Sequence, residues 1–243
     1  IPAVRDRVAQ EVIRRLLSPI FTPLFHEASF GFIEGRNCHQ ACLRVLQYHD
    51  EGYWVVLDAD IVGFFDNLLQ DIIMAAVAAE VADGNILRLI EKFLRAGVIE
   101  NGVFKPTTIG TPQGGVISPL LANIVLNYLD WQLQKHGYRF VRYADDFVVV
   151  TRTHAEAGEA RTLVEQTLAQ LGLKLSAEKT KITTYGKGYS FLGFVLSKWS
   201  RRMRPKSVKK LQDKVRELTV RHHNLGAEAI AKLNQVIRGT ALY

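Results

Sequence analysis

The stretch FVRYADDFVVV, residues 140–150, places two adjacent aspartates between short runs of aromatic and β-branched residues. Apolar runs of this length on both sides of a polar tip predict a strand, a turn and a second strand. Aspartate is a common turn residue, because its side chain bonds nearby backbone groups. Two adjacent carboxylates are also suitable oxygen ligands for a hard cation such as Mg²⁺. Asp145 and Asp146 can therefore be turn formers or metal ligands, and this stretch alone leaves both interpretations open.

A second acidic site, LDADIVGFFDN, occupies residues 57–67. Asp60 ends a predicted strand over residues 53–60, and strand ends are where catalytic groups tend to project. If the two acidic strand ends meet at one sheet edge, their three carboxylates can bridge two Mg²⁺ ions, the arrangement used for phosphoryl transfer. An acid after a strand is also common in folds without such a site.

Between the acidic sites lies IGTPQGGVISPLL, residues 109–121. Its glycines remove side chains where another backbone or a nucleotide can approach closely. An ordinary Gly-Pro turn leading into a helix explains the run equally well, and it matches no Walker pattern.

The rest of the chain alternates between helical and strand patterns without an internal repeat. Apolar periodicity predicts helices over residues 4–20, 38–48, 68–81, 86–96, 118–133 and 160–171. A hairpin is predicted over residues 98–108 and a strand over YSFLGFVLS, residues 189–197. This mixture indicates the α+β class.

Composition narrows the class of protein further. The chain has 243 residues, of which 48% are hydrophobic, so it can build a substantial core. No apolar run reaches the length of a membrane span, and the first residues do not form a signal peptide. Cys38 and Cys42 have no second pair at zinc-finger spacing, which predicts reduced thiols. Because the chain starts at Ile1 and stops at Tyr243 in mid-pattern, we expect it to be a fragment.

The positive charge of the chain is concentrated near its end. The net charge is +7, and residues 198–221 hold ten Lys or Arg against Asp213 and Glu217. This helix-forming segment therefore carries +8 and the remainder −1. Such a segment favours a polyanionic partner, most often nucleic acid, although a solvated helix face would have the same composition.

Taken in order, the motifs resemble those of reverse transcriptases, most closely the group II intron-encoded kind. Seven blocks and a tail carry the resemblance across nearly the whole chain. They are IPAVRDRVAQ, SFGFIEGRNCHQA, DADIVGFFDN, GTPQGGVISPLLANIVLN, YADD, LGLKLSAEKTK and FLGF, followed by MRPKSVKKL and LNQVIRGTALY.

The resemblance implies a right-hand polymerase fold. Residues 1–197 would form the fingers and a palm with an antiparallel sheet, and residues 198–243 the truncated start of an α-helical thumb or maturase region. The implied activity is RNA-directed DNA synthesis, joined to an intron-RNA-binding maturase role. The alternatives are a protein that is mainly a splicing maturase, or a CRISPR-associated, retron or diversity-generating reverse transcriptase.

The resemblance also implies roles for individual residues. Asp60, Asp145 and Asp146 would hold two Mg²⁺ ions, for which Mn²⁺ can substitute, with the Ile61 carbonyl as an extra ligand. Phe65 would exclude the ribose 2′-hydroxyl, and the adjacent Phe64 would pack in the core. Lys179 would neutralise or protonate the leaving pyrophosphate, although a solvated surface lysine is an equal alternative. Nucleotide and primer contacts would come from Pro112, Gln113, Gly114 and Tyr143. Nucleic-acid contacts would come from Arg5, Arg7, Leu192, Gly193, Arg204, Lys206, Lys209 and Lys210.

The chain departs from the family's pattern in several places. Ile33 and Glu34 replace a frequent Arg-Pro, Val62 a frequent Lys and Thr240 a usual Trp. Expected partners are an RNA template, intron RNA, a DNA primer, deoxynucleotides and a second copy of the chain, but no membrane. The expected location is the bacterial cytoplasm or an organelle.

Overall fold

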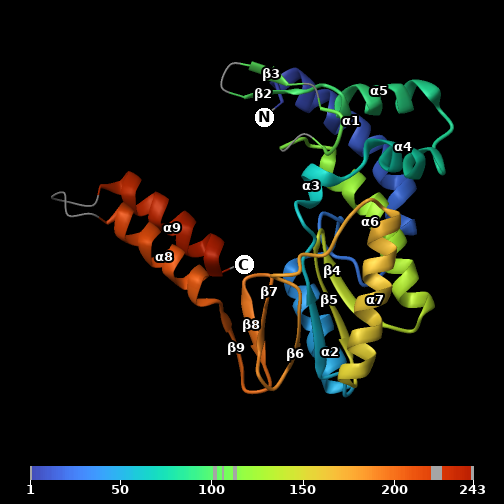
Figure 1. Cartoon of the computed structure of the whole chain (residues 1–243). Helices are drawn as coiled ribbons and strands as arrows, with labels where there is room; N and C mark the ends of the chain where they lie inside the picture. Colours follow the sequence, from blue (N-terminus) through green and yellow to red (C-terminus); the bar gives the residue numbers. More distant parts are fainter. Residues whose placement is uncertain (1, 101–102, 106, 112–113, 220–225, 242–243) are drawn as a thin grey trace. The chain divides into compact units, whose positions relative to one another are not determined.

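The computed structural model describes residues 2–100, 103–105, 107–111, 114–219 and 226–241 (Figure 1). The chain divides into two compact units, Ile1–Thr183 and Thr184–Tyr243. The family boundary expected after residue 197 stays a prediction.

The first unit is organised around a four-stranded sheet in the order β4-β5-β1-β6. Its strands are β1 (Val55–Ala59), β4 (Arg139–Tyr143), β5 (Asp146–Thr151) and β6 (Lys181–Thr184). β5 runs antiparallel to both β4 and β1. The last five residues of β5 are all buried, and a strand covered on both faces has the unbroken apolar run that the sequence shows.

Helices cover both faces of this sheet (Figure 1). On one face, Leu57, Ala59, Phe147 and Val149 join the main hydrophobic core. The helices α6 (Ser118–Lys135) and α7 (His154–Gln170) pack against the sheet on this side. Because side chains alternate along a strand, Asp58, Asp60 and Asp146 point to the opposite face. There α2 (Cys38–Asp50) packs against β4 and β5.

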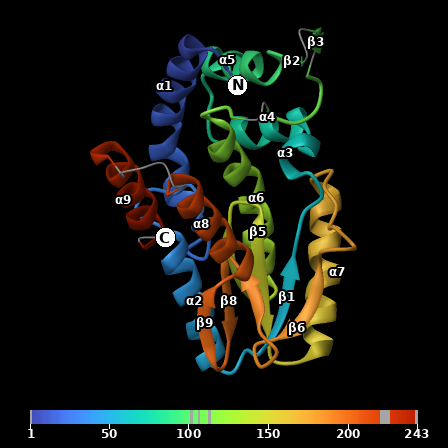
Figure 2. The ribbon, with the colours of Figure 1, turned by 90° about the vertical axis from the view of Figure 1, so that its left-hand side faces the viewer.

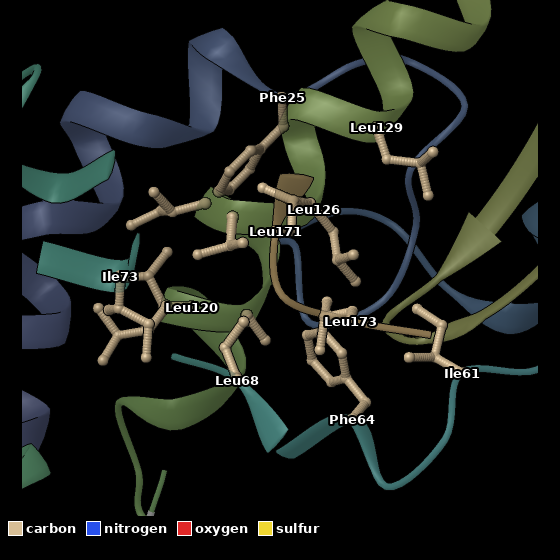
Figure 3. Packing of buried hydrophobic residues seen from close by; sticks show 14 of the residues in the cluster. Phe25, Ile61, Phe64, Leu68, Ile73, Leu120, Leu126, Leu129, Leu171 and Leu173 are labelled. Atoms are coloured by element: carbon tan, nitrogen blue, oxygen red, sulfur yellow. The ribbon is translucent and has the colours of Figure 1, made fainter. Parts of the chain in front are cut away.

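Several elements of the first unit lie beyond the end of the sheet (Figure 1). They are α1 (Val4–Phe21), α3 (Phe64–Asn67), α4 (Gln70–Ala78), α5 (Gly84–Leu94), β2 (Val98–Glu100) and β3 (Val103–Lys105). The 3₁₀ turn η1 (Thr22–Leu24) follows α1 and contacts α6 through the Leu24 carbonyl. One continuous core joins α1, α3, α4 and α5 to the sheet, with Phe64, Leu68, Ile73 and Leu120 among its members (Figure 3).

The second unit combines a three-stranded sheet with two helices (Figure 2). The strands β7 (Tyr189–Phe191), β8 (Phe194–Ser197) and β9 (Ser200–Met203) pair antiparallel. The helices α8 (Pro205–Leu218) and α9 (Ala227–Ala241) lie side by side and contact each other.

Most predicted elements are present, but two expectations were wrong. YSFLGFVLS is not one strand, because Leu192 (φ 47°) and Gly193 (φ 85°) fold it into the β7–β8 hairpin. The helix expected over residues 68–81 is present as α4, which is shorter and spans Gln70–Ala78. The basic segment begins with β9 and becomes helical only at Pro205.

Candidate active site

The two acidic stretches meet at one edge of the sheet. Ala59 of β1 pairs with Phe147 of β5, so the next rung of this antiparallel ladder sets Asp60 beside Asp146. Tyr143 pairs with Asp146, which leaves Ala144 and Asp145 as a two-residue turn between β4 and β5. The hairpin predicted around the aspartate pair is confirmed, and its tip lies next to the end of β1.

Two lysines, one just before β6 and one at its start, pair with acids in β1 and directly after it. The Lys179 Nζ lies 3.2 Å from the Asp60 Oδ2, and the Lys181 Nζ lies 3.4 Å from the Asp58 Oδ2. The Lys179 and Asp60 side chains are 70% and 40% exposed. Exposed ion pairs contribute at most about 1 kcal/mol, so this one exchanges its partner easily.

Burial affects the titration of two acids at this edge. Burial raises the pKa of Asp145, and the nearby Asp60 carboxylate raises it further, against the opposing effects of its own backbone hydrogen bond and of Arg142. Burial also raises the pKa of Asp58, although Lys181 opposes this shift. Both shifts favour the protonated form of these carboxyl groups.

The donor set suits a hard divalent cation, although the side chains do not converge in this structure. Asp60, Asp145 and Asp146 offer carboxylate oxygens, the ligands that Mg²⁺ prefers. Among the described residues, no group of three acidic, histidine or cysteine side chains is arranged to hold an ion. Ile61, the expected carbonyl ligand, forms an isolated bridge with Leu175, and its side chain lies in the core (Figure 3).

Phe64 and Phe65 have different surroundings. Phe64 is 2% exposed and points into the core beside Leu173 (Figure 3). Phe65 is only partly buried, and its ring centroid lies 5.1 Å from that of Phe64 at an interplanar angle of 74°. The prediction that Phe64 is the buried ring is confirmed, whereas the role of Phe65 stays a prediction.

The glycine-containing loop packs directly on the turn that carries Phe65. The Thr111 N–H donates to the Phe65 carbonyl at 2.8 Å, and the Gly110 N–H donates to the Leu68 carbonyl at 2.9 Å. A Cβ on Gly110 would lie 2.7 Å from the Phe65 carbonyl oxygen, so this approach requires glycine. Pro112 and Gln113 lie outside the described residues, and Gly114, just after them, is exposed.

The other residues predicted for the first unit are more scattered. Tyr143 is partly buried next to the aspartate turn, its ring 6.3 Å from that of Phe32, and burial raises its pKa. Arg5 and Arg7 are exposed on the first turns of α1.

In the second unit, Leu192 and Gly193 form the turn between β7 and β8. The Gly193 carbonyl accepts a hydrogen bond of 2.8 Å from the Arg204 N–H, which fixes the start of α8 to this turn. Arg204, Lys206, Lys209 and Lys210 are all exposed. Arg221, at the end of the predicted basic segment, lies outside the described residues.

Not all basic groups of α8 are equally available. Lys214 pairs with Glu217, and Arg216 pairs with Asp213. Within the described part of the chain, no ion pair joins Lys206, Lys209 or Lys210 to an acid.

Sequence reasoning missed Arg142, Asp58 and Lys181. Arg142 stands inside an apolar strand and is fully buried. A charged residue in such a run is the signal that could have identified it, because buried charges are rare unless paired.

The antiparallel sheet, its acidic edge and the glycine loop packed on the adjacent turn define the class of right-hand nucleic-acid polymerases. The chain belongs to the reverse transcriptase (RNA-dependent DNA polymerase) family, whose model matches residues 1–196.

Individual relatives agree with this assignment. Protein YkfC of Escherichia coli (strain K12) is 34% identical, with 79% of this chain and 61% of that protein aligned. The group II intron-encoded protein LtrA of Lactococcus lactis is 40% identical over 54% of this chain and 22% of that protein. The predicted resemblance to group II intron-encoded reverse transcriptases is confirmed. The chain spans less than two thirds of the length of these relatives.

Solved structures show the fold. Apo telomerase from Candida tropicalis superposes with a TM-score of 0.64 at 12% identity, covering 87% of this chain and 44% of that one. The predicted right-hand polymerase fold is thereby confirmed. In the part of the chain that the structure describes, no helix combines the length and hydrophobicity needed to cross a membrane.

Proposed function

We propose that this chain is the polymerising part of an RNA-directed DNA polymerase of the group II intron type. One observation carries the proposal: Asp60 and the Asp145–Asp146 pair, far apart in sequence, stand on neighbouring strand ends of the same sheet. Carboxylates gathered in this way serve phosphoryl transfer, where catalysis is mostly positioning and neutralisation of charge.

In the proposed reaction, the primer 3′-oxygen attacks the α-phosphorus of a deoxynucleotide paired with an RNA template. The bond from the α-phosphorus to pyrophosphate breaks, and the 3′-hydroxyl proton passes to solvent water. Asp60, Asp145 and Asp146 would hold two Mg²⁺ ions, which supply Lewis-acid stabilisation of the attacking and leaving oxygens. The residues of this chain would hold the carboxylates at one sheet edge, and the glycine loop is hydrogen-bonded to the turn that carries Phe65, five residues after Asp60.

Lys179 has two competing roles in this proposal. Its ammonium pairs with Asp60 at 3.2 Å, so it balances one carboxylate before the substrate arrives. On release from Asp60, the Lys179 ammonium would neutralise the leaving pyrophosphate or donate a proton to it. Its 70% exposure leaves the side chain room for this movement.

Asp145→Asn tests the proposal. In the full-length protein, this change should abolish primer extension on an RNA template and weaken Mg²⁺ binding, because one of three anionic ligands is lost. Asp71→Asn, at an exposed position on α4, provides the matched control and should extend primers normally. Near-normal extension by the Asp145 variant would refute the carboxylate assignment.

A second function, intron-RNA binding as in a maturase, is favoured by the surface of α8. Lys206, Lys209 and Lys210 are exposed and have no acidic partner within the described residues. Lysines arranged in this way bind a phosphate backbone rather than stabilise the helix. The nucleic acid would be structured RNA or the template–primer hybrid, both recognised mainly through backbone and shape.

Salt dependence of binding tests this second function. Each phosphate neutralised contributes roughly −0.7 to −0.9 to the slope of log affinity against log salt. Replacing Lys206, Lys209 and Lys210 by Glu should flatten the slope by about two units. Replacing the lysines at 92, 135 and 232 by Glu changes the net charge equally and should leave the slope nearly unchanged. Equal slopes for the first variant and the unmodified protein would show that α8 only faces solvent.

A further inference from the structure

The strongest unexplained feature lies on the core side of the aspartate hairpin. Arg142, three residues before Asp145, is 0% exposed. Its Nε and Nη2 donate to the two carboxylate oxygens of Asp130 at 2.8 and 2.5 Å. Its Nη1 donates to the Asn123 side-chain oxygen at 2.8 Å and to the Ala144 carbonyl at 2.9 Å. A charged residue therefore fills the interior of the sheet–helix interface with four hydrogen bonds.

Stability alone is a poor explanation for this arrangement. Taking an ion pair out of water is costly, and apolar residues of the same volume are often at least as stabilising. What the guanidinium offers instead is a rigid planar fork that fixes several acceptors relative to one another. One of those acceptors is the Ala144 carbonyl, inside the turn that precedes Asp145.

Ala144 needs such a restraint. Its φ is +58°, in the left-handed region that costs an L residue free energy. Within the described residues, the other non-glycine positions with positive φ are Phe32 and Leu192, each beside another predicted functional motif. A strained turn keeps one conformation only when its surroundings over-determine it.

The loop before α2 holds the same turn from the other side. The Asn123 side chain, which accepts from Arg142, donates to the Gly31 carbonyl at 2.7 Å. A Cβ added to Gly31 would lie 2.3 Å from the Ala144 backbone nitrogen, so the loop presses directly on the turn. The Arg142 backbone bonds this loop as well, through the Ala28 carbonyl and the Phe30 N–H.

We propose that Arg142, held by Asp130 and Asn123 of α6, is a positioning residue that fixes the Ala144–Asp145 turn against the end of β1. The proposal rests on the proposed function, because its purpose is to place the two hairpin carboxylates relative to Asp60. Arg142 acts through the Ala144 carbonyl and lies on the side of the sheet away from Asp60.

Replacement of the ion pair by apolar residues is the first test. The double variant Arg142→Met with Asp130→Leu should fold with a melting temperature close to that of the unmodified protein. Its kcat for primer extension should fall between about tenfold and a hundredfold, as for a small misplacement of catalytic groups. The KM for the nucleotide should change little, while the Mg²⁺ concentration giving half-maximal rate should rise. A folded double variant with unchanged kcat would overturn the proposal.

A conservative pair of variants separates the fork from the charge. Arg142→Lys keeps the charge and loses the fork, so its kcat should also fall. Adding Ala144→Gly should recover part of that loss, because glycine adopts the left-handed conformation without penalty. No recovery would overturn the proposed route through Ala144. Arg139→Lys, at an exposed position of the same strand, is the matched control and should behave as the unmodified protein does.

Hydrogen exchange of the purified protein gives a readout that does not depend on activity. Amides of residues 143–147 should exchange at least about tenfold faster in Arg142→Lys than in Arg139→Lys, because the turn loses its anchor. Equal exchange in the two variants would overturn the inference. Failure of the unmodified protein to extend primers would instead contradict the proposed function and leave the exchange result standing.

Discussion

On one face of the palm sheet, Asp130 and Arg142 are both 0% exposed and joined by two short hydrogen bonds, whereas on the other, Asp60 and Lys179 are 40% and 70% exposed and 3.2 Å apart. The buried pair cannot exchange its partner, because no water or ion reaches it. The exposed pair can, because solvent competes for both charges. The difference shows how one sheet combines a fixed hairpin on its core side with carboxylates on its open side that accept a new cation.

The largest difference between the two faces should appear in stability. Asp130→Ala leaves the Arg142 charge buried without a partner, so the free energy of unfolding should fall by about 3–5 kcal/mol. Lys179→Ala removes an exposed pair and should cost at most about 1 kcal/mol. Urea denaturation of both variants measures these values. Equal losses would mean that the two pairs are not energetically different.

The two adjacent phenylalanines allow a second test of the difference between buried and open positions. Phe64→Ala should lower the free energy of unfolding by about 3–4 kcal/mol, because a fully buried ring leaves a cavity. Phe65→Ala should keep the fold and admit ribonucleotides more readily, on the order of tenfold for each 1.4 kcal/mol of relieved overlap. The ratio of ribonucleotide to deoxynucleotide incorporation, measured beside melting temperatures, separates them. Relaxed sugar selection in the Phe64 variant instead would reverse the assignment.

The smallest expected effect is a pH dependence of stability at the acidic edge. Burial and Asp60 raise the pKa of Asp145 in the folded state, so the folded protein binds a proton more tightly than the unfolded chain. The stability of the metal-free protein should therefore decrease as the pH rises from about 4 through the raised pKa. Asp145→Asn removes this titration and should melt slightly higher than the unmodified protein at neutral pH, with the gap closing in acid.

Melting temperatures measured between pH 3 and 7 with a metal chelator present test this expectation. Asp71→Asn again serves as the control, since that carboxylate is exposed on α4. A variant at position 145 that melts lower than the unmodified protein at neutral pH would show that the carboxylate stabilises the apo hairpin.

The helix α1 illustrates where local pattern stops being sufficient. Its periodicity predicts the helix correctly, yet Val8, Val12 and Leu16 are exposed, whereas Ile13, Leu17 and Phe21 are buried. Both sets recur every four residues, so either could form the buried face. Contact with α6 decides between them, and that partner lies about a hundred residues further along the chain.

In the candidate site, too, some features follow from short sequence segments and others from tertiary contacts. The acidic pairs, the glycine loop and the order of the motifs are properties of short segments, so the sequence by itself determined the fold class and the family resemblance. The placement of Asp60 beside Asp146 depends on the register between strands almost ninety residues apart.

Only the tertiary structure showed that Arg142 bonds Asp130, Asn123 and Ala144 at once, and that FLGF folds into a turn. The physical reason is the range of the interactions. Periodicity, turn preference and charge pattern involve residues a few positions apart, so they can be recognised in the sequence. The burial of a charge and the choice of the buried helix face depend on contacts between residues that are distant in the sequence, and these contacts form only in the folded structure.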